Sequence, residues 1–231
     1  VIVSGCDAHI EKETYIKMPE VDVVLGNDVK LDEAIWGEIV ESGRSGFFGK
    51  TDQKLKNKKT KILPNFTKRS RAYLEIQNGC DHSCTFCIIP QGRGLSKSVA
   101  ADTILEKINK LVDKGFKEIV LTGVDITCWG SDLSGNNKLG DLVIKILDKT
   151  PNLPRLRLSS IDVSEMDDGL LHVFKTNKRM MPHLHLSLQS GNNLILKRMK
   201  RRHSREQAID LCKNLKAARP ELTFGADLIA G

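Results

Sequence analysis

The sequence predicts an α/β protein in two parts: a partial parallel β/α barrel and, before it, the remnant of a smaller α/β domain. Two observations lead to this class. From Tyr73 to the carboxyl end, segments with strand character alternate with segments of helical periodicity, which favours a parallel sheet with crossover helices, open or curled toward a barrel. The 231 residues are 40% hydrophobic and 28% charged, which excludes a collagen-like, low-complexity or wholly disordered chain.

Residues 1–42 are expected to be an incomplete amino-terminal domain. The chain opens on Val rather than Met, and Val1–Val3 is predicted to be a strand already under way. Val21–Gly26 is predicted to be a second strand, and Leu31–Glu41 a helix, because its apolar residues recur at helical spacing. At the other end, Leu222–Gly231 is predicted to be a strand with nothing after it. We therefore expect a fragment of a longer protein, cut at both ends.

Residues 43–67 are expected to form a basic linker, because hydrophobic periodicity is lost there and Gly, Lys and Pro punctuate the segment. The formal net charge of +7 is unevenly spread. Nine Lys or Arg and one acid lie between Lys50 and Arg71, and six Lys or Arg and no acid lie between Lys197 and Arg205. Two such clusters indicate a polyanionic partner or, equally, a solvated linker and a solvated helix start.

Residues 68–231 are expected to form the barrel, truncated at its carboxyl end. The predicted strands are Tyr73–Gln77, Glu118–Thr122, Arg155–Ser159, His183–Leu188 and Leu222–Ile229, and the predicted helices are Asp102–Lys114, Leu139–Lys149, Glu165–Lys175 and Ser204–Ala218. Thr103 and Glu106 stand at capping-box spacing near the start of the first helix, and Ser204 and Gln207 do so in the last. In parallel α/β folds, functional residues gather at the carboxyl ends of strands.

The chain carries no sign of a membrane or secreted location. No apolar run approaches the roughly 18 residues needed to cross a bilayer, and the first residues lack the pattern of a signal peptide. We therefore expect a cytoplasmic protein with no membrane partner. Six cysteines in such a chain indicate metal binding or catalysis rather than disulfides.

Cys80, Cys84 and Cys87 form a C-x3-C-x2-C triplet directly after the first strand of the barrel. Three thiolates on one loop can hold three irons of a cubane cluster and leave the fourth iron open for a substrate. His82 also permits a Cys3His zinc site, although it sits too close between Cys80 and Cys84 to fold back easily. Three buried structural thiols are less favoured, because the Gly-rich and polar flanks offer no core to fill.

At this triplet the sequence resembles a known family. C-x3-C-x2-C with an aromatic, here Phe86, before the last Cys is the signature of radical S-adenosylmethionine enzymes, and the stretch 77–90 resembles that of the methylthiotransferases. Within that family, the stretches 184–191 and 196–203 resemble the branch that acts on threonylcarbamoyladenosine beside the tRNA anticodon. The isopentenyladenosine branch typically has Pro-Val-Gln-Ser-Gly at the first of these stretches.

The resemblance implies roles for several residues of the barrel. Cys80, Cys84 and Cys87 would hold a 4Fe–4S cluster that binds S-adenosylmethionine, and Phe86 would lie beside the adenine of that cofactor. Asp125 ends a segment that stands where the superfamily has Gly-Gly-Glu, although the residues of the two segments differ. The resemblance implies that Asp125 contacts the cofactor. Gln189 would contact the cofactor ribose. For Asp125 and Gln189, ordinary turn residues remain an equal alternative.

The resemblance also implies a second 4Fe–4S cluster in the amino-terminal domain, held by three cysteines of which the third lies in Gly-Cys-x-Ala-Gln. Residues 5–9 match this stretch with His9 in place of Gln, so Cys6 is the expected ligand, and its two partners would lie upstream of Val1. Without the resemblance, a buried thiol is the favoured interpretation of Cys6. Cys128 and Cys212 match no ligand of the family and are expected in the core.

The expected function is a tRNA-modifying methylthiotransferase that places a methylthio group on C2 of N6-threonylcarbamoyladenosine at position 37. The cofactors would be S-adenosylmethionine and two 4Fe–4S clusters, one of them in this fragment, and the fragment alone would be inactive in the full reaction. The partners would be tRNA, an electron donor and a sulfur donor. The side chains expected to grip tRNA phosphates are those of Lys197, Arg198, Lys200, Arg201 and Arg202. The alternatives are the same chemistry on isopentenyladenosine or on a ribosomal protein, and a zinc-dependent RNA-binding module without catalysis.

Overall fold

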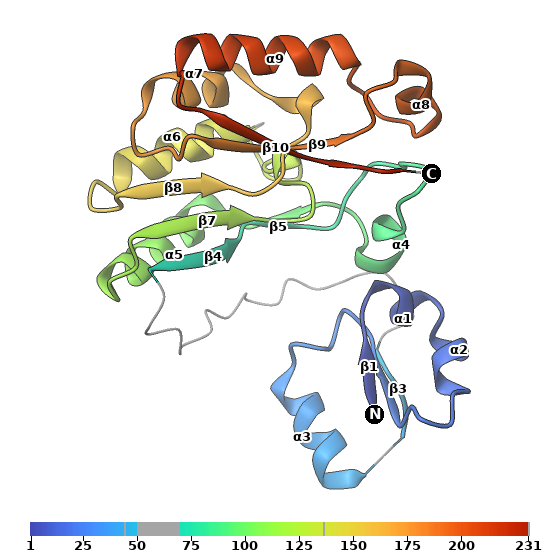
Figure 1. Ribbon diagram of the computed structural model, residues 1–231. Helices are drawn as coiled ribbons and strands as arrows, with labels where there is room; N and C mark the ends of the chain where they lie inside the picture. Colours follow the sequence, from blue (N-terminus) through green and yellow to red (C-terminus); the bar gives the residue numbers. More distant parts are fainter. Residues whose placement is uncertain (44, 50–69, 136, 231) are drawn as a thin grey trace. The chain divides into compact units, whose positions relative to one another are not determined.

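The structure is a computed structural model, and it describes residues 1–43, 45–49, 70–135 and 137–230 (Figure 1). The chain divides into two compact units. The amino-terminal unit combines the described residues of Val1–Lys59 with the loop Gly79–Leu95, and the carboxy-terminal unit combines those of Thr60–Asn78 with Ser96–Gly231. The sequence placed the loop 79–95 in the larger part, whereas its packing assigns it to the amino-terminal unit.

The amino-terminal unit contains a small parallel sheet in the order β1-β2-β3. Its elements are β1 (Ile2–Ser4), α1 (Cys6–Ile10), α2 (Lys12–Ile16), β2 (Val23–Leu25), α3 (Glu33–Ser42), β3 (Gly46–Phe48) and, in the loop, α4 (Ile89–Arg93). The central strand β2 is buried along its whole length, and its Val23 and Leu25 pack with Ile39 of α3. The helix α3 begins where the Asp32 carboxylate accepts the Ala34 N–H at 3.2 Å, and it ends at Gly43, whose φ of +59° suits glycine.

Strand β3 was not expected. Residues 46–48 fall within the segment predicted to be a linker, yet they pair in parallel with β2. Three residues that begin with glycine show no period-two pattern, so only the pairing with β2 makes them a strand. The basic run between Lys50 and Arg69 lies outside the described residues.

The carboxy-terminal unit contains the alternating strands and helices that the sequence predicts. Its strands are β4 (Arg71–Glu75), β5 (Gln77–Asn78), β6 (Lys97–Ser98), β7 (Glu118–Thr122), β8 (Arg155–Leu158), β9 (His183–Gln189) and β10 (Thr223–Leu228). Its helices are α5 (Ala101–Asp113), α6 (Leu139–Lys149), α7 (Asp168–Thr176), α8 (Asn193–Arg198) and α9 (Arg205–Ala218), with 3-10 turns η1 (Ile126–Cys128) and η2 (Val163–Glu165).

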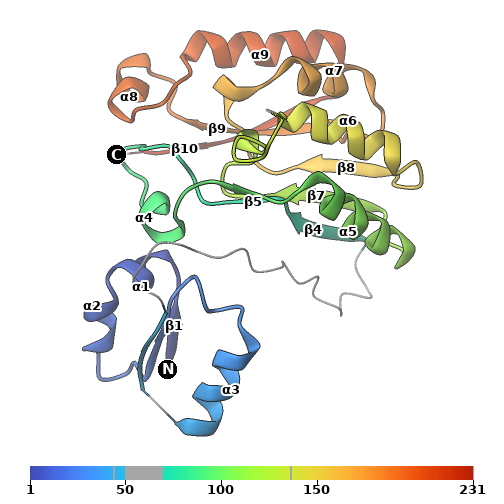
Figure 2. The ribbon, with the colours of Figure 1, turned by 180° about the vertical axis from the view of Figure 1, so that it is seen from behind.

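Strands β5 and β6 pair antiparallel with each other, and the other five strands form a parallel system that helices cover on one side. Strands β4, β7 and β8 are neighbours in one sheet and β9 and β10 in another, and the parallel bridges Leu156–Met180 and Ile161–Leu186 connect the two. Helices α5, α6, α7 and α9 flank the strands (Figures 1 and 2). Their apolar faces join alternate strand residues in one core, which confirms the predicted partial parallel β/α fold.

The opposite face of this sheet is polar. Glu118 of β7 is buried, and its carboxylate meets Arg71 of β4 at 2.9 Å and Arg157 and Arg155 of β8 at 2.7 and 3.4 Å. Burial alone would raise the pKa of Glu118, but Arg157 and Arg71 hold it below its usual value. Three guanidinium groups around one carboxylate thus connect β4, β7 and β8 near the amino-terminal ends of these strands.

The two expected capping boxes have different outcomes. Ser204 and Gln207 form theirs at the start of α9, where the Gln207 N–H donates to Ser204 Oγ at 3.2 Å and Gln207 Oε1 accepts the Ser204 N–H at 2.7 Å. The expectation for Thr103 was wrong, because α5 begins at Ala101 and its N-cap, Ala100, makes no side-chain cap. Among the described residues, no helix has both the length and the apolar character needed to cross a membrane.

Candidate active site

The loop Gly79–Leu95 carries the cysteine triplet and is closed tightly at its base. The Cys80 N–H donates to the Gly94 carbonyl at 3.1 Å. Gly79 has a φ of +76°, and a Cβ there would lie 2.0 Å from the Leu95 carbonyl oxygen. Only glycine permits this approach, so the two ends of the loop lie in close contact. The three cysteines therefore lie on one short segment.

The triplet offers three thiols that fit a cluster. Cys80, Cys84 and Cys87 are half-buried thiols that take part in no disulfide. The His82 backbone N–H points to Cys80 Sγ at 3.4 Å, and the Cys87 N–H donates to the Cys84 carbonyl in a turn. Partly exposed thiols, of which Cys80 has a backbone donor at its sulfur, suit iron–sulfur ligation better than thiols in a packed core do. Phe86, just before the last cysteine, is 46% exposed and free to stack on a planar ligand.

The carboxy-terminal unit holds the segment Thr122–Asp125 in place through Gln77, a residue that sequence reasoning missed. Gln77 is fully buried, and its Oε1 accepts the backbone N–H groups of Val124 at 3.1 Å and Asp125 at 2.8 Å. Its Nε2 donates to Ser96 Oγ at 2.9 Å. Gln77 is the first residue of the short strand β5, three positions before Cys80, and nothing in the local sequence indicates that its side chain is buried.

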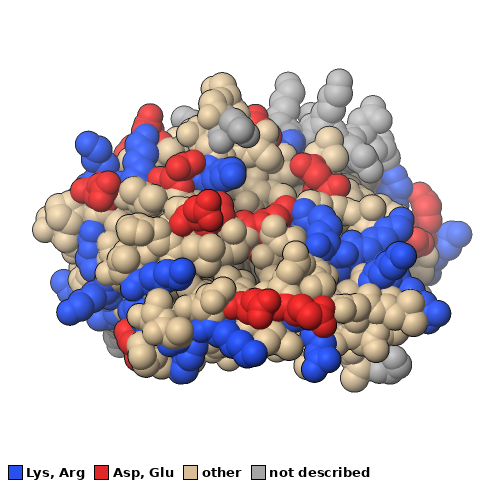
Figure 3. All heavy atoms as spheres, turned by 90° about the horizontal axis from the view of Figure 1, so that it is seen from above, with Lys and Arg blue, Asp and Glu red and all other residues tan. Residues whose placement is uncertain are grey.

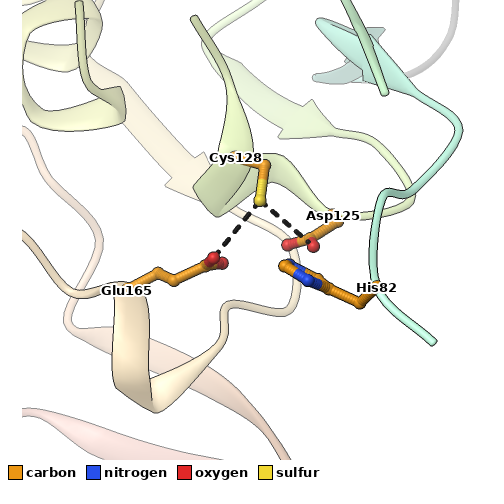
Figure 4. Close-up of side chains that lie close together, drawn as sticks. All are labelled: His82, Asp125, Cys128 and Glu165. Atoms are coloured by element: carbon orange, nitrogen blue, oxygen red, sulfur yellow. Dashed lines mark hydrogen bonds between the residues drawn. The ribbon is translucent and has the colours of Figure 1, made fainter. Parts of the chain in front are cut away.

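Asp125 lies beside Cys128 and Glu165 (Figure 4). Cys128 Sγ is 3.4 Å from Asp125 Oδ2 and 3.3 Å from Glu165 Oε1, and Thr127 Oγ1 donates to Asp125 Oδ1 at 2.8 Å. Burial first, and then the two carboxylates, raise the pKa of the Cys128 thiol far above its ordinary value, so it stays protonated and can donate. His82, also drawn in Figure 4, belongs to the amino-terminal unit.

The expectation that Cys128 belongs to the core was therefore wrong. The residue follows β7 on the turn η1, where the chain leaves the apolar layer at the carboxyl end of the strand. Neighbouring Trp129 is buried in the core, which made the whole segment appear apolar in sequence. Cys212 on α9 does pack against the core, as expected.

Gln189 ends β9 in a strained conformation. Its φ is +66°, which is uncommon outside glycine, and the register with β10 shifts beside it. The Gln189 carbonyl still accepts the Ile229 N–H at 3.0 Å. An outlier of this kind, held by the surrounding sheet at the carboxyl end of a strand, is typical of a ligand-binding position.

The basic segment 197–205 divides into internal and surface residues. The Arg201 side chain is 8% exposed, and its guanidinium donates to Asp162 Oδ2 and to the Ser187 carbonyl, both at 2.7 Å. Arg202 pairs with Glu165 and, at 3.1 Å, with Asp162. This corrects the expectation that both arginines grip tRNA, since Arg201 in particular is committed to the fold. Lys197, Arg198 and Lys200 are exposed.

The surface on the α9 side does not form a single basic field. Lys and Arg side chains are interspersed with Asp and Glu over this face (Figure 3). A polyanion would therefore be held by particular side chains rather than by a broad positive potential.

Cys6, the expected ligand of a second cluster, is the first residue of α1 and is half-buried. It is a free thiol, and Asn27 Nδ2 lies 3.6 Å from its sulfur. The residue is thus accessible enough to ligate a metal and has a donor beside it.

Comparison with known proteins adds a family. Residues 74–231 match the model of the radical SAM superfamily. Threonylcarbamoyladenosine tRNA methylthiotransferases MtaB of Rickettsia prowazekii and Bacillus subtilis are 46% and 34% identical to this chain over its whole length, and the matches cover 54% and 51% of those proteins. A tRNA-2-methylthio-N(6)-dimethylallyladenosine synthase of Pelagibacter ubique is 34% identical, with 52% of it covered. The chain thus spans about half the length of the curated relatives it matches.

Solved structures agree in fold. The radical S-adenosylmethionine methyltransferase TsrM of Kitasatospora setae matches 72% of this chain with 31% of its own, at a TM-score of 0.57 and 13% identity. The cobalamin-dependent S-adenosylmethionine radical enzyme OxsB matches 68% of this chain with 23% of its own, at a TM-score of 0.54 and 18% identity. At such identities the likeness concerns the fold alone.

Proposed function

The chain belongs to the radical SAM superfamily, and we propose that it is the cofactor-binding core of a methylthiotransferase that modifies C2 of N6-threonylcarbamoyladenosine at position 37 of tRNA. One observation carries this proposal. The identity of 46% to a relative with that activity extends over the whole chain, including the loop that presents Cys80, Cys84 and Cys87.

The target position explains why such a cofactor is needed. C2 of adenine carries hydrogen and no leaving group, so acid–base or nucleophilic groups of a protein cannot replace that hydrogen with sulfur. A 4Fe–4S cluster with bound S-adenosylmethionine supplies a radical strong enough to abstract it. The three thiols of the loop would hold this cluster, and Phe86 would cover the adenine of the cofactor.

The carboxy-terminal unit would bind and orient the cofactor's polar groups. Gln77 fixes the backbone on either side of Val124 and so sets the position of Asp125. Gln189 would contact the ribose from the carboxyl end of β9. Lys197, Arg198 and Lys200 would contact tRNA phosphates, after the target base has left the anticodon stack.

Further parts of the proposal concern the complete protein. Cys6 would hold a second 4Fe–4S cluster together with two cysteines outside this chain, and that cluster would present the sulfur. An electron donor and a sulfur donor would serve the two clusters. A tRNA substrate would place the protein in the cytoplasm.

The isopentenyladenosine branch is the second candidate, because a relative with that activity is 34% identical over the whole chain. Ser187 and Leu188 stand where that branch usually has Pro and Val, and this difference favours the first candidate. The sequence of the same stretch also disfavours a ribosomal protein as the substrate. The superfamily match argues against the zinc-dependent RNA-binding module.

Deleting the gene and digesting the cell's tRNA tests the substrate. We expect 2-methylthio-N6-threonylcarbamoyladenosine to disappear from the nucleosides in mass spectrometry, while the isopentenyl counterpart remains. Persistence of the first nucleoside with loss of the second would assign the chain to the other branch.

A further inference from the structure

Asn27 joins Cys6 to the loop that carries the cysteine triplet, and all three belong to the amino-terminal unit. The residue follows β2 and precedes α3. Its side-chain Nδ2 lies 2.6 Å from the Gly92 carbonyl oxygen and 3.6 Å from Cys6 Sγ. An amide nitrogen carries two hydrogens, so it can donate to both acceptors at once.

The orientation of this amide follows from its other neighbour. Lys30 Nζ lies 2.9 Å from the atom assigned as Asn27 Oδ1. An ammonium group only donates, so the atom facing it is the oxygen, and the nitrogen faces Gly92 and Cys6. The Asn27 backbone N–H points to His9 Nδ1 at 3.3 Å, which ties the same residue to α1 a second time.

Gly92 brings the two elements into direct contact. It is buried in α4, and a Cβ there would lie 2.7 Å from Cys6 Cβ and 3.1 Å from Cys6 Cα. The backbone of α4 therefore packs against Cys6 with no side chain between them. Asn27 then bridges this contact, because it donates to the carbonyl of one partner and to the sulfur of the other.

We propose that Asn27 is a positioning residue that holds Cys6 against the triplet loop and donates a hydrogen bond to the Cys6 sulfur when that sulfur is a cluster ligand. This inference rests on the proposed function, which makes Cys6 a ligand. Hydrogen bonds to ligating sulfurs favour the reduced, more negative form of an iron–sulfur cluster. Asn27 therefore raises the reduction potential of the cluster that Cys6 holds.

The test compares Asn27→Asp with the wild type in the complete protein loaded with both clusters. The variant keeps the size of the side chain and an oxygen for Lys30, but replaces the two donors with a carboxylate oxygen. Redox titration followed by electron paramagnetic resonance separates the clusters, because the spectrum of the triplet cluster responds to added S-adenosylmethionine. For the other cluster, the ratio of reduced to oxidised form at a fixed potential should fall about fivefold or more, the size expected when one hydrogen bond is removed.

Two controls keep the result interpretable. Asn214→Asp makes the same change at an exposed position of α9 and should leave both potentials unchanged. If Asn27→Asp does not assemble both clusters, Asn27→Ser, which lacks the amide but adds no charge, should show a shift in the same direction. An unshifted potential in a variant that retains full iron content overturns the inference.

Cys6→Ser separates this failure from failure of the proposed function. Loss of the cluster that is insensitive to S-adenosylmethionine supports the assignment of Cys6, and an unshifted Asn27 variant then defeats the inference alone. Retention of that cluster in Cys6→Ser would overturn the assignment of Cys6 and the inference with it.

Discussion

Asp162 shows how one buried carboxylate organises its surroundings. Arg201 and Arg202 reach it from the segment after α8, and His203 Nδ1 lies 3.8 Å from its other oxygen. Burial alone would raise the pKa of Asp162, but His203, Ser164 and Arg201 hold it well below its usual value. Arg202 also pairs with Glu165, so this cluster links a structural ion pair to the acids around Cys128.

Neutralising Asp162 tests this cluster. In the metal-free chain at pH 7, Asp162→Asn should lower the free energy of unfolding by about 3–5 kcal/mol, because it leaves buried arginine charge uncompensated. A carboxylate with a depressed pKa contributes stability above its unfolded value, here 3.8, and loses it as the pH falls further. The wild type should therefore lose stability more steeply than the variant below that pH.

Denaturant unfolding at a series of pH values measures both effects. Asp148→Asn, at an exposed position of α6, is the matched control and should change the free energy of unfolding by less than about 0.5 kcal/mol. Parallel pH profiles for wild type and Asp162→Asn would contradict the depressed pKa.

At the scale of elements, predictability followed length and amphipathic pattern. The bounds of β7 and α6 match the predicted ones, because both have clear buried faces and clear ends. The helix expected from Glu165 begins instead at Asp168, since the side chain of Asp167 caps it and residues 163–165 form a 3-10 turn. Helices α1, α2, α4 and α8 were missed, because five or six residues show too little periodicity.

The same limit applies to the candidate site. The cysteine triplet was predictable, because its spacing alone indicates the chemistry. Gln77 and Glu165 were not, since their importance comes from contacts with residues 47–48 and 37 positions away in the chain. The internal role of Arg201 was hidden for the same reason, because only the fold brings Asp162 to it.

The two capping sites provide a matched pair of substitutions. Ser204→Ala removes a cap that the structure contains and should lower the free energy of unfolding by about 1 kcal/mol. Thr103→Ala lies inside α5 on its exposed side and should be neutral or slightly stabilising, because alanine favours helix more than threonine. Thermal or denaturant unfolding of the metal-free chain distinguishes them, and a comparable loss in both would mean that Thr103 is a cap after all.

The exposed lysines around the end of α8 are the element to test for tRNA binding. Lys197→Gln with Lys200→Gln should weaken tRNA binding and flatten the dependence of log affinity on log salt by about 0.7–0.9 for each phosphate that is no longer neutralised. Lys213→Gln with Lys175→Gln, at exposed positions of α9 and α7, is the control with the same charge change. The slope is measured by filter binding at several salt concentrations. An unchanged slope would mean that these lysines are solvated and do not contact tRNA phosphates.

At the scale of the whole molecule, the candidate cluster ligands and the other candidate site residues belong to different units of the chain. The amino-terminal unit holds Cys6 and the cysteine triplet, while the carboxy-terminal unit holds Gln77, Asp125 and Gln189. The chain contains six cysteines, and the two that remain are poor substitutes as cluster ligands. Cys128 is kept protonated between two carboxylates, and Cys212 packs on the core from α9. Under the proposed function, the cysteines of this chain would therefore supply one complete set of three ligands and a single member of a second.

This division predicts the behaviour of the 231-residue chain when it is reconstituted without oxygen. We expect one 4Fe–4S cluster per chain by iron analysis, because only the triplet is complete, and cleavage of S-adenosylmethionine to 5′-deoxyadenosine without a methylthio product. Cys84→Ser should abolish the cleavage, since it removes one of the three ligands, whereas Cys6→Ser should leave it intact. Chromatography of the nucleoside products measures the cleavage. Two full clusters per chain would contradict the argument, because a second set of ligands would then have to include Cys128 or Cys212.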